Sequence, residues 1–195
     1  MDFEGCFRNL DAGDYHHARA VHDAAPPSPG PHEACENALI ECLGGSIVMA
    51  DVADFTATFL AYTPDVVVTL CSKPCRIPEG HVGTWHLFDI NGLHTSSRYA
   101  PCYAEVVDCI QGHLNQHRTV LIHCLEGRDR TGIVGLSLMM LARPSVAHDD
   151  IVREMVAARP KRNEDWVTRF GLLREGSEYH TTAKAVVEVL DRLES

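Results

Sequence analysis

The run Val66-Val67-Val68 is the feature that most constrains the fold of this chain. Consecutive β-branched residues favour a strand over a helix. Because the run is apolar at every position, it predicts a strand buried on both faces, as in parallel sheets covered by helices on each side. Strand-like and helix-like segments alternate along the rest of the chain. We therefore expect an α/β fold with a central, mostly parallel sheet flanked by helices on both faces.

The expected elements follow from apolar spacing and from the positions of proline and glycine. Pro26–Pro31 interrupts any regular element, so residues 1–34 are interpreted as an N-terminal arm and Pro-rich linker, and residues 35–195 as the folded domain. We expect strands at 38–42, 46–50, 65–71, 84–90 and 119–123, and helices at 53–62, 99–117, 131–141, 145–158, 163–173 and 178–194.

The composition excludes several classes of function. Lysine and arginine total 17 and aspartate and glutamate total 27, so the net charge is −10 and disfavours nucleic acid as a partner. The longest apolar stretch, 133–142, is shorter than the ~20 residues of a membrane span, so we expect no integral membrane association. The N-terminus does not resemble a signal peptide. We interpret the eight cysteines as free thiols of a cytoplasmic protein, with a nuclear location also open, and we expect a monomer.

The segment Val120–Gly132 combines an apolar strand, a loop with a central glycine and the start of a helix. In such a loop, successive backbone amides can turn inward and form a site for an anion, and the helix N-terminus adds partial positive charge at the same point. Cys124 begins the loop and Arg130 ends it. The guanidinium of Arg130 can donate two parallel hydrogen bonds to a phosphate. The segment therefore predicts a phosphate-binding loop with a thiol at its base.

The same surroundings predict the chemistry of the loop. Helix N-termini and nearby cations stabilise the thiolate form of cysteine, which is the nucleophile. We expect Cys124 to attack the phosphorus of a bound monoester and to form a phosphocysteine. Arg130 and the loop amides would stabilise the transition state, and the hydroxyl of Thr131 would help the sulfur to leave. His123 is expected to be buried and to support the loop.

The pattern His123-Cys124-x5-Arg130-Thr131-Gly132 resembles the signature of the cysteine-dependent protein tyrosine phosphatase superfamily. The short chain resembles the compact dual-specificity group, and the segment Pro64–Val68 is similar to that of cyclin-dependent-kinase-associated phosphatases. The resemblance implies a dual-specificity-phosphatase-like fold and a phosphatase that needs neither a cofactor nor a metal. It also implies that residues Leu125, Glu126, Gly127, Arg128, Asp129 and Arg130 bind the substrate phosphate.

Hydrolysis also needs a proton donor for the leaving group. The resemblance implies an aspartate on a loop before the nucleophile, and Asp89, 35 residues before Cys124, fits this position. Glu126 and Asp129 stay open as alternatives, because acids at these two positions resemble the loop of myotubularin-type phosphoinositide phosphatases.

The charge of the loop bears on the substrate. Residues 125–130 contain two arginines and two acids, so their formal charge is zero. This favours a singly phosphorylated group, and we expect a phosphoprotein substrate. A phosphoinositide is the main alternative. An RNA 5′-triphosphate, or an inactive scaffold that only binds phosphate, is a minor one.

Three further groups of residues were considered. The resemblance implies that Cys71, at the end of a strand, could form a reversible disulfide with Cys124, although core packing is its simpler role. Arg159, Arg162 and Asn163 follow a helix and are interpreted as solvated rather than as part of the cleft. A zinc site could also be considered for four residues: Cys71, Cys75, His81 and His86. Their spacing is unlike that of a zinc finger, so we do not expect them to bind zinc.

Overall fold

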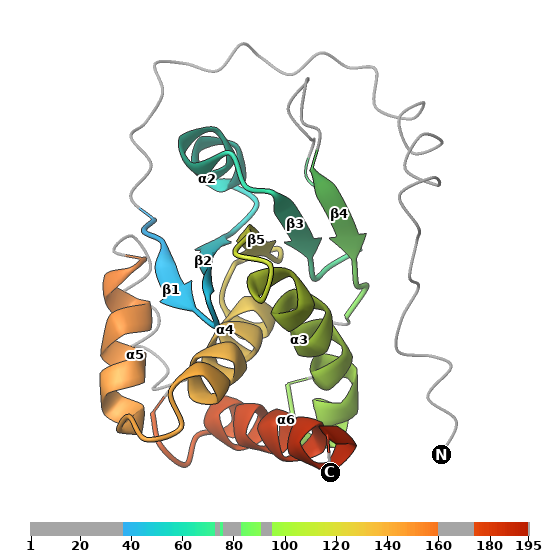
Figure 1. The fold of residues 1–195 in the computed structure, drawn as a ribbon, viewed down its shortest axis with the longest axis vertical. Helices are drawn as coiled ribbons and strands as arrows, with labels where there is room; N and C mark the ends of the chain where they lie inside the picture. The colour runs from blue at the N-terminus through green and yellow to red at the C-terminus, as the bar shows by residue number, and fades with distance from the viewer. Residues whose placement is uncertain (1–36, 73–74, 76–82, 91–94, 160–173, 195) are drawn as a thin grey trace.

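The computed structural model describes residues 37–72, 75, 83–90, 95–159 and 174–194. The predicted arm at 1–34 and the predicted helix at 163–173 lie outside these residues. Within them, the chain alternates between strands and helices, as the sequence predicts (Figure 1).

A five-stranded sheet lies at the centre of the fold, in the order β1-β2-β5-β3-β4. Its strands are β1 (Ile40–Cys42), β2 (Gly45–Ala50), β3 (Val66–Thr69), β4 (Thr84–Leu87) and β5 (Thr119–His123). β1 pairs antiparallel with β2 in a hairpin, and every other pair is parallel. β5 is therefore the middle strand, and its carboxyl end meets those of β2, β3 and β4 at one edge of the sheet.

Side chains alternate between the two faces of the sheet, as the period of a strand requires. One face packs against α2 (Phe55–Tyr62) through a small cluster of buried residues: Val48, Ala50, Phe55, Phe59, Val67, Trp85 and Leu121. The other face carries the larger core, which includes Val66, Val68, Val120 and Ile122. The Val66–Val68 run is thus fully buried on both sides, as predicted.

Four helices cover the face with the larger core: α3 (Ala100–Leu114), α4 (Asp129–Ala142), α5 (His148–Ala157) and α6 (Glu178–Glu194). A short 3-10 helix, η2 (Ser97–Tyr99), leads into α3. The residues Thr131–Met139 of α4 are all buried, because α4 lies between the sheet and its neighbouring helices. In the first turn of α4, at the carboxyl edge of β5, Thr131 and Gly132 are buried, whereas Asp129 and Arg130 are half-buried.

The structure corrects several predicted boundaries. The strand predicted at 84–90 ends at Leu87, because the amide of Ile90 donates to the carbonyl of Phe88 in a tight turn that leaves the sheet. The helix predicted from Thr131 begins at Asp129, so the end of the loop already has helical geometry. The helix predicted at 145–158 begins only at His148.

Candidate active site

Cys124 directly follows β5, the middle strand of the sheet. Its side chain is 1% exposed and belongs to the larger core. Residues Leu125–Arg128 form the loop above it, and α4 begins at Asp129. The thiol therefore lies at the base of a short loop that joins a buried strand to the N-terminus of a buried helix.

The turn of the loop depends on Gly127. Its φ of +59° lies in the left-handed region, which disfavours other residues. A Cβ at this position would lie 2.6 Å from the carbonyl oxygen of Ala50. The guanidinium of Arg159 lies directly below and donates a hydrogen bond from Nη1 to the Gly127 carbonyl oxygen. Glycine is required here because the neighbouring backbone and a buried arginine leave no space for a side chain.

Several hydrogen-bond donors of the loop have no acceptor within the described part of the chain. Among the described residues, none accepts a hydrogen bond from the backbone amides of Leu125, Glu126 or Gly127. The hydroxyl of Thr131, in the first turn of α4, is buried and also has no partner there. Buried polar groups almost always find a partner, so these donors indicate a site for an acceptor.

Arg130 extends from the first turn of α4 across the carboxyl edge of the sheet. Its Nη1 donates to the carbonyl oxygens of Leu70, at 3.1 Å, and Ile90, at 2.9 Å. Its Nε is buried without an acceptor among the described residues. One edge of the guanidinium is thus anchored to the protein, and the edge with Nε remains for a bidentate ligand such as a phosphate.

Asp89 lies shortly after the end of β4 and directly before Ile90, whose carbonyl oxygen anchors Arg130. It is half-buried and follows β4 at the same edge of the sheet at which Cys124 follows β5. In the described part of the chain, no hydrogen bond or ion pair engages its carboxyl group. The structure therefore brings Asp89 to the edge that holds the loop, although the two segments are 35 residues apart.

The two acids within the loop are paired. Glu126 forms an ion pair with Arg128 at 2.8 Å, and its side chain is 58% exposed. Asp129 Oδ1 accepts hydrogen bonds from Arg128 Nε at 3.0 Å and from the Tyr179 hydroxyl at 2.9 Å. Both acids thus neutralise Arg128, and Asp129 also connects the loop to α6. Leu125, at the rim, is 47% exposed.

His123 is fully buried on the side of the sheet that packs against α2. Its Nε2 forms a hydrogen bond with the Thr69 hydroxyl at 2.7 Å, and its ring contacts Phe55 with centroids 4.6 Å apart. Burial lowers the pKa of His123 to about 4, because the charged imidazole loses hydration. The ring is therefore neutral near pH 7 and supports the strand that leads into the loop.

Sequence reasoning missed three residues around the loop. Arg159 was interpreted as solvated, but its side chain is 1% exposed and lies 3.7 Å from the Asp54 carboxylate. The charge of Asp54 and the carbonyl of Gly127 hold it in the interior. Tyr103 is fully buried and close enough to Arg130 and Cys124 for their charges to act on its hydroxyl. Tyr179 approaches from α6, and no local pattern in the sequence indicates these contacts.

The outcomes for the remaining candidates differ. Arg162, Asn163 and His81 lie outside the described residues. Two residues of the zinc candidate, Cys75 and His86, lie on opposite sides of the sheet. Cys75 packs on the side that faces α2, whereas His86 faces His113 of α3, so the two do not share a metal site. Cys71 is buried, is not part of a disulfide and follows β3, the strand next to β5. Its pairing with Cys124 stays a prediction.

A comparison with models of protein families shows the family to which the chain belongs. The model described as the tyrosine phosphatase family matches residues 90–190, which contain the whole loop. This chain belongs to the tyrosine phosphatase family. The match begins one residue after Asp89, and it includes α3, α4, α5 and α6 as far as residue 190. No curated protein matches this tyrosine phosphatase family member.

Solved structures of phosphatases share the fold. Human DUSP28 is 10% identical, with a TM-score of 0.55, and the alignment covers 80% of this chain and 99% of that one. A mouse putative dual specificity phosphatase is 10% identical, with a TM-score of 0.54, over 88% and 97% of the two chains. A leucine rich repeat and phosphatase domain containing protein from Entamoeba histolytica is 11% identical, with a TM-score of 0.51, over 82% and 94%. The predicted fold class is confirmed.

The structure also bears on membrane association. None of the helices in the described ranges combines the length and the apolar character that crossing a bilayer requires.

Proposed function

We propose that this member of the tyrosine phosphatase family hydrolyses phosphate monoesters of proteins through a phosphocysteine on Cys124. One observation carries the proposal. A buried thiol lies beneath a loop in which the amides of residues 125–127, together with Arg130 Nε and the Thr131 hydroxyl, have no acceptor among the described residues. A tetrahedral phosphate supplies the oxygens that these donors lack, and it presents its phosphorus to the sulfur.

The first step transfers the phosphoryl group to the enzyme. The Cys124 thiolate attacks phosphorus, the bond between phosphorus and the leaving oxygen breaks, and Asp89 gives its proton to that oxygen. The anchored Arg130 holds the equatorial oxygens through the transition state. In the second step, Asp89 takes a proton from water, the water oxygen attacks phosphorus and the sulfur leaves as a thiolate. The Thr131 hydroxyl donates to that sulfur.

Asp89 is proposed as the general acid because its carboxyl group is unpaired within the described residues. The two alternatives are engaged elsewhere: Glu126 lies at the exposed rim, and Asp129 is held by Arg128 and Tyr179. A carboxyl oxygen that already accepts two hydrogen bonds is held in place by them, so Asp129 is less available to reach a leaving group than Asp89.

A protein substrate is proposed because the described loop offers little positive charge for further phosphates. Arg128 is the only cation of the loop besides Arg130. It is already paired with Glu126 and Asp129, so it would have to lose both partners to bind a second phosphate. This favours a singly phosphorylated side chain over a polyphosphorylated lipid head group.

The decisive experiment compares the wild type with Cys124→Ser on a chromogenic aryl phosphate in the presence of EDTA. We expect the variant to lose turnover and to keep phosphate binding, and a rapid acid quench of the wild type with labelled substrate to trap phosphate on the protein. Cys42→Ser is the matched control, because a serine there keeps the hydrogen bond to the Leu138 carbonyl. Full turnover by Cys124→Ser would overturn the mechanism.

A second comparison tests the substrate class. Phosphopeptides carrying phosphotyrosine, phosphothreonine or phosphoserine are assayed beside monophosphorylated and polyphosphorylated phosphoinositides. We expect kcat/KM to be highest for a phosphopeptide. A higher value for a polyphosphorylated lipid would assign the protein to phosphoinositides and leave the phosphocysteine mechanism intact.

A further inference from the structure

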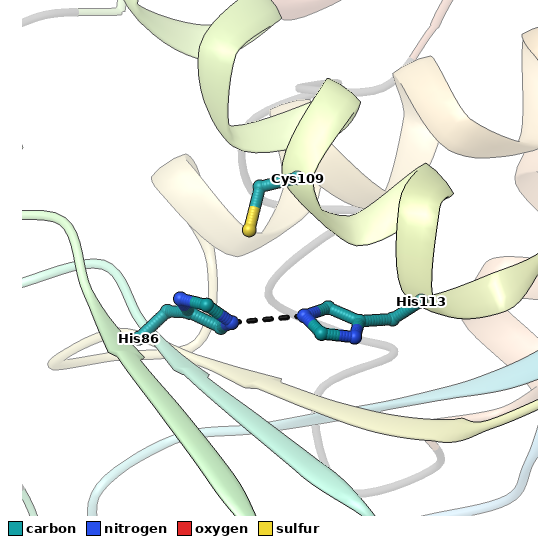
Figure 2. A group of neighbouring side chains, drawn as sticks. All are labelled: His86, Cys109 and His113. Carbon is teal, nitrogen blue, oxygen red and sulfur yellow. Dashed lines mark hydrogen bonds between the residues drawn. The ribbon is translucent and has the colours of Figure 1, made fainter. Parts of the chain in front are cut away.

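A cluster of metal-ligating side chains lies away from the Cys124 loop, between the edge strand β4 and α3. It consists of His86, Cys109 and His113 (Figure 2). Cys109 and His113 are separated by one turn of α3, and His86 comes from β4 opposite them. All three are half-buried. Positions i and i+4 of a helix share a face, so the fold directs three donor atoms to one point.

The distances fit a small metal ion. The two Nε2 atoms are 2.8 Å apart, and the three donor atoms all lie within 4.8 Å of one another. A tetrahedral zinc ion, with bonds of about 2.0–2.1 Å to nitrogen and about 2.3 Å to sulfur, keeps its ligand atoms roughly 3.3–3.6 Å apart. The imidazoles need to separate by about half an ångström and the sulfur to approach by about one, which rotations of half-buried side chains supply.

The chemistry of the donors selects the kind of metal. Two imidazoles and one thiolate suit zinc and similar transition metals, whereas magnesium and calcium prefer oxygen ligands. Burial lowers the pKa of His86 and of His113, in the direction of the neutral imidazole that binds metal. The thiol of Cys109 releases its proton to solvent when the metal–sulfur bond forms. We propose that His86, Cys109 and His113 form a binding site for Zn²⁺, with the fourth ligand position open to water.

Two charged groups lie beside the cluster. Burial, and in addition the charge of Asp108, raises the pKa of the Cys109 thiol to about 11, and Arg118 Nη1 lies 3.1 Å from His113 Nδ1. When zinc occupies Nε2 of His113, its Nδ1 carries the proton and needs an acceptor instead of the guanidinium. Arg118 is only partly buried, so its side chain can turn into solvent. Arg118 thus opposes zinc binding. A variant that removes its charge should therefore bind zinc more tightly than the wild type.

A bound ion would join β4 to α3. In the described sheet, β4 has a neighbouring strand on one side only, and His86 lies three residues before Asp89. Zinc would therefore fix the strand that carries the proposed general acid. The site uses no residue of the Cys124 loop, so it stands or falls independently of the proposed function.

The experiment measures zinc affinity by competition with a chromophoric chelator. It uses the full chain after removal of metals, in a Cys124→Ser background that takes the loop thiol out of the competition. We expect one site whose affinity falls by about 100-fold or more in each of His86→Gln, Cys109→Ser and His113→Gln. His117→Asn is the matched control, because His117 has a φ of +61° that asparagine tolerates.

Two further measurements make the result independent of folding defects. Arg118→Gln should bind zinc about tenfold more tightly, because its amide oxygen can accept the Nδ1 proton. With Co²⁺ as the probe, the protein should show the visible bands of tetrahedral cobalt and a thiolate charge-transfer band that disappears in Cys109→Ser. Equal affinity in the three ligand variants and the control, or unchanged affinity in Arg118→Gln together with no thiolate band, would overturn the proposal.

Discussion

Arg130 Nη1 donates a hydrogen bond of 2.9 Å to the carbonyl oxygen of Ile90, the residue that follows Asp89. The same nitrogen holds the carbonyl of Leu70, after β3. The arginine proposed to bind phosphate therefore also positions the backbone beside the proposed general acid. Binding and proton transfer are coupled through a single guanidinium group.

This coupling predicts the effect of Arg130→Lys. A lysine has one point charge and cannot hold two carbonyls while offering a flat edge to phosphate. We expect kcat/KM on an aryl phosphate to fall by about 10²- to 10³-fold or more. The control is Arg98→Lys, a substitution at an exposed arginine that packs on the Tyr99 ring. Steady-state kinetics of both variants provide the comparison, and equal activity in the two would contradict the role of Arg130.

The assignment of Asp89 predicts a dependence on the leaving group. Asp89→Asn should lower kcat by about 10²- to 10⁴-fold for alkyl or phenyl phosphates, which need protonation, and much less for nitrophenyl phosphate. Asp129→Asn should keep the leaving-group dependence of the wild type, because its carboxylate serves Arg128 and Tyr179. If the dependence appears in Asp129→Asn or Glu126→Gln instead, the acid is that residue.

The contacts of Arg159, which lies outside the loop, predict that its substitution lowers the stability of the protein strongly. Arg159→Leu removes the donor to the Gly127 carbonyl and leaves the Asp54 carboxylate without its arginine. We expect the free energy of unfolding to fall by about 3–5 kcal/mol, measured with urea. Arg153→Leu, six residues earlier on α5 and with a 75% exposed side chain, should change it by about 1 kcal/mol or less. Similar losses in the two variants would show that Arg159 does not hold the loop.

His123 predicts a pH dependence of stability. Its pKa is about 4 in the folded chain and about 6.5 when unfolded. Between these values the unfolded chain binds the extra proton, so the free energy of unfolding declines as the pH falls from 6.5 to 4, by on the order of 3 kcal/mol. Urea unfolding at several pH values should show a shallower decline in His123→Gln. His117→Asn, at an exposed histidine, should follow the wild type, and an unchanged slope in His123→Gln would refute the contribution.

The sequence predicted those parts of the fold and the site that depend on local patterns. The strand at 119–123 and the helix at 178–194 have the predicted bounds, because turns and apolar spacing define them locally. The loop was found because strand, glycine turn and helix are contiguous. The sequence also predicted that Asp89 lies at the carboxyl edge of the sheet, because the carboxyl ends of parallel strands meet at one edge.

Other features depend on contacts between distant segments. Arg159 lies 32 residues from Gly127, and nothing beside it in the sequence distinguishes a buried arginine from a solvated one. The cluster of His86, Cys109 and His113 was also not predicted, because it requires knowing that α3 packs beside β4. The sequence places His86 in one zinc candidate with Cys75. The two residues lie on opposite faces of the sheet, which the spacing alone does not reveal.

The pairing of Arg128 with Glu126 and Asp129 also affects how substrates arrive. Arg128, the cation at the rim of the described loop, is neutralised by its two acidic partners, and the net charge of the chain is −10, so Arg128 adds little to the long-range attraction of anions. Capture of a phosphorylated partner must then depend on short-range contacts, so added salt should leave the association rate nearly unchanged or increase it by screening the repulsion between like charges.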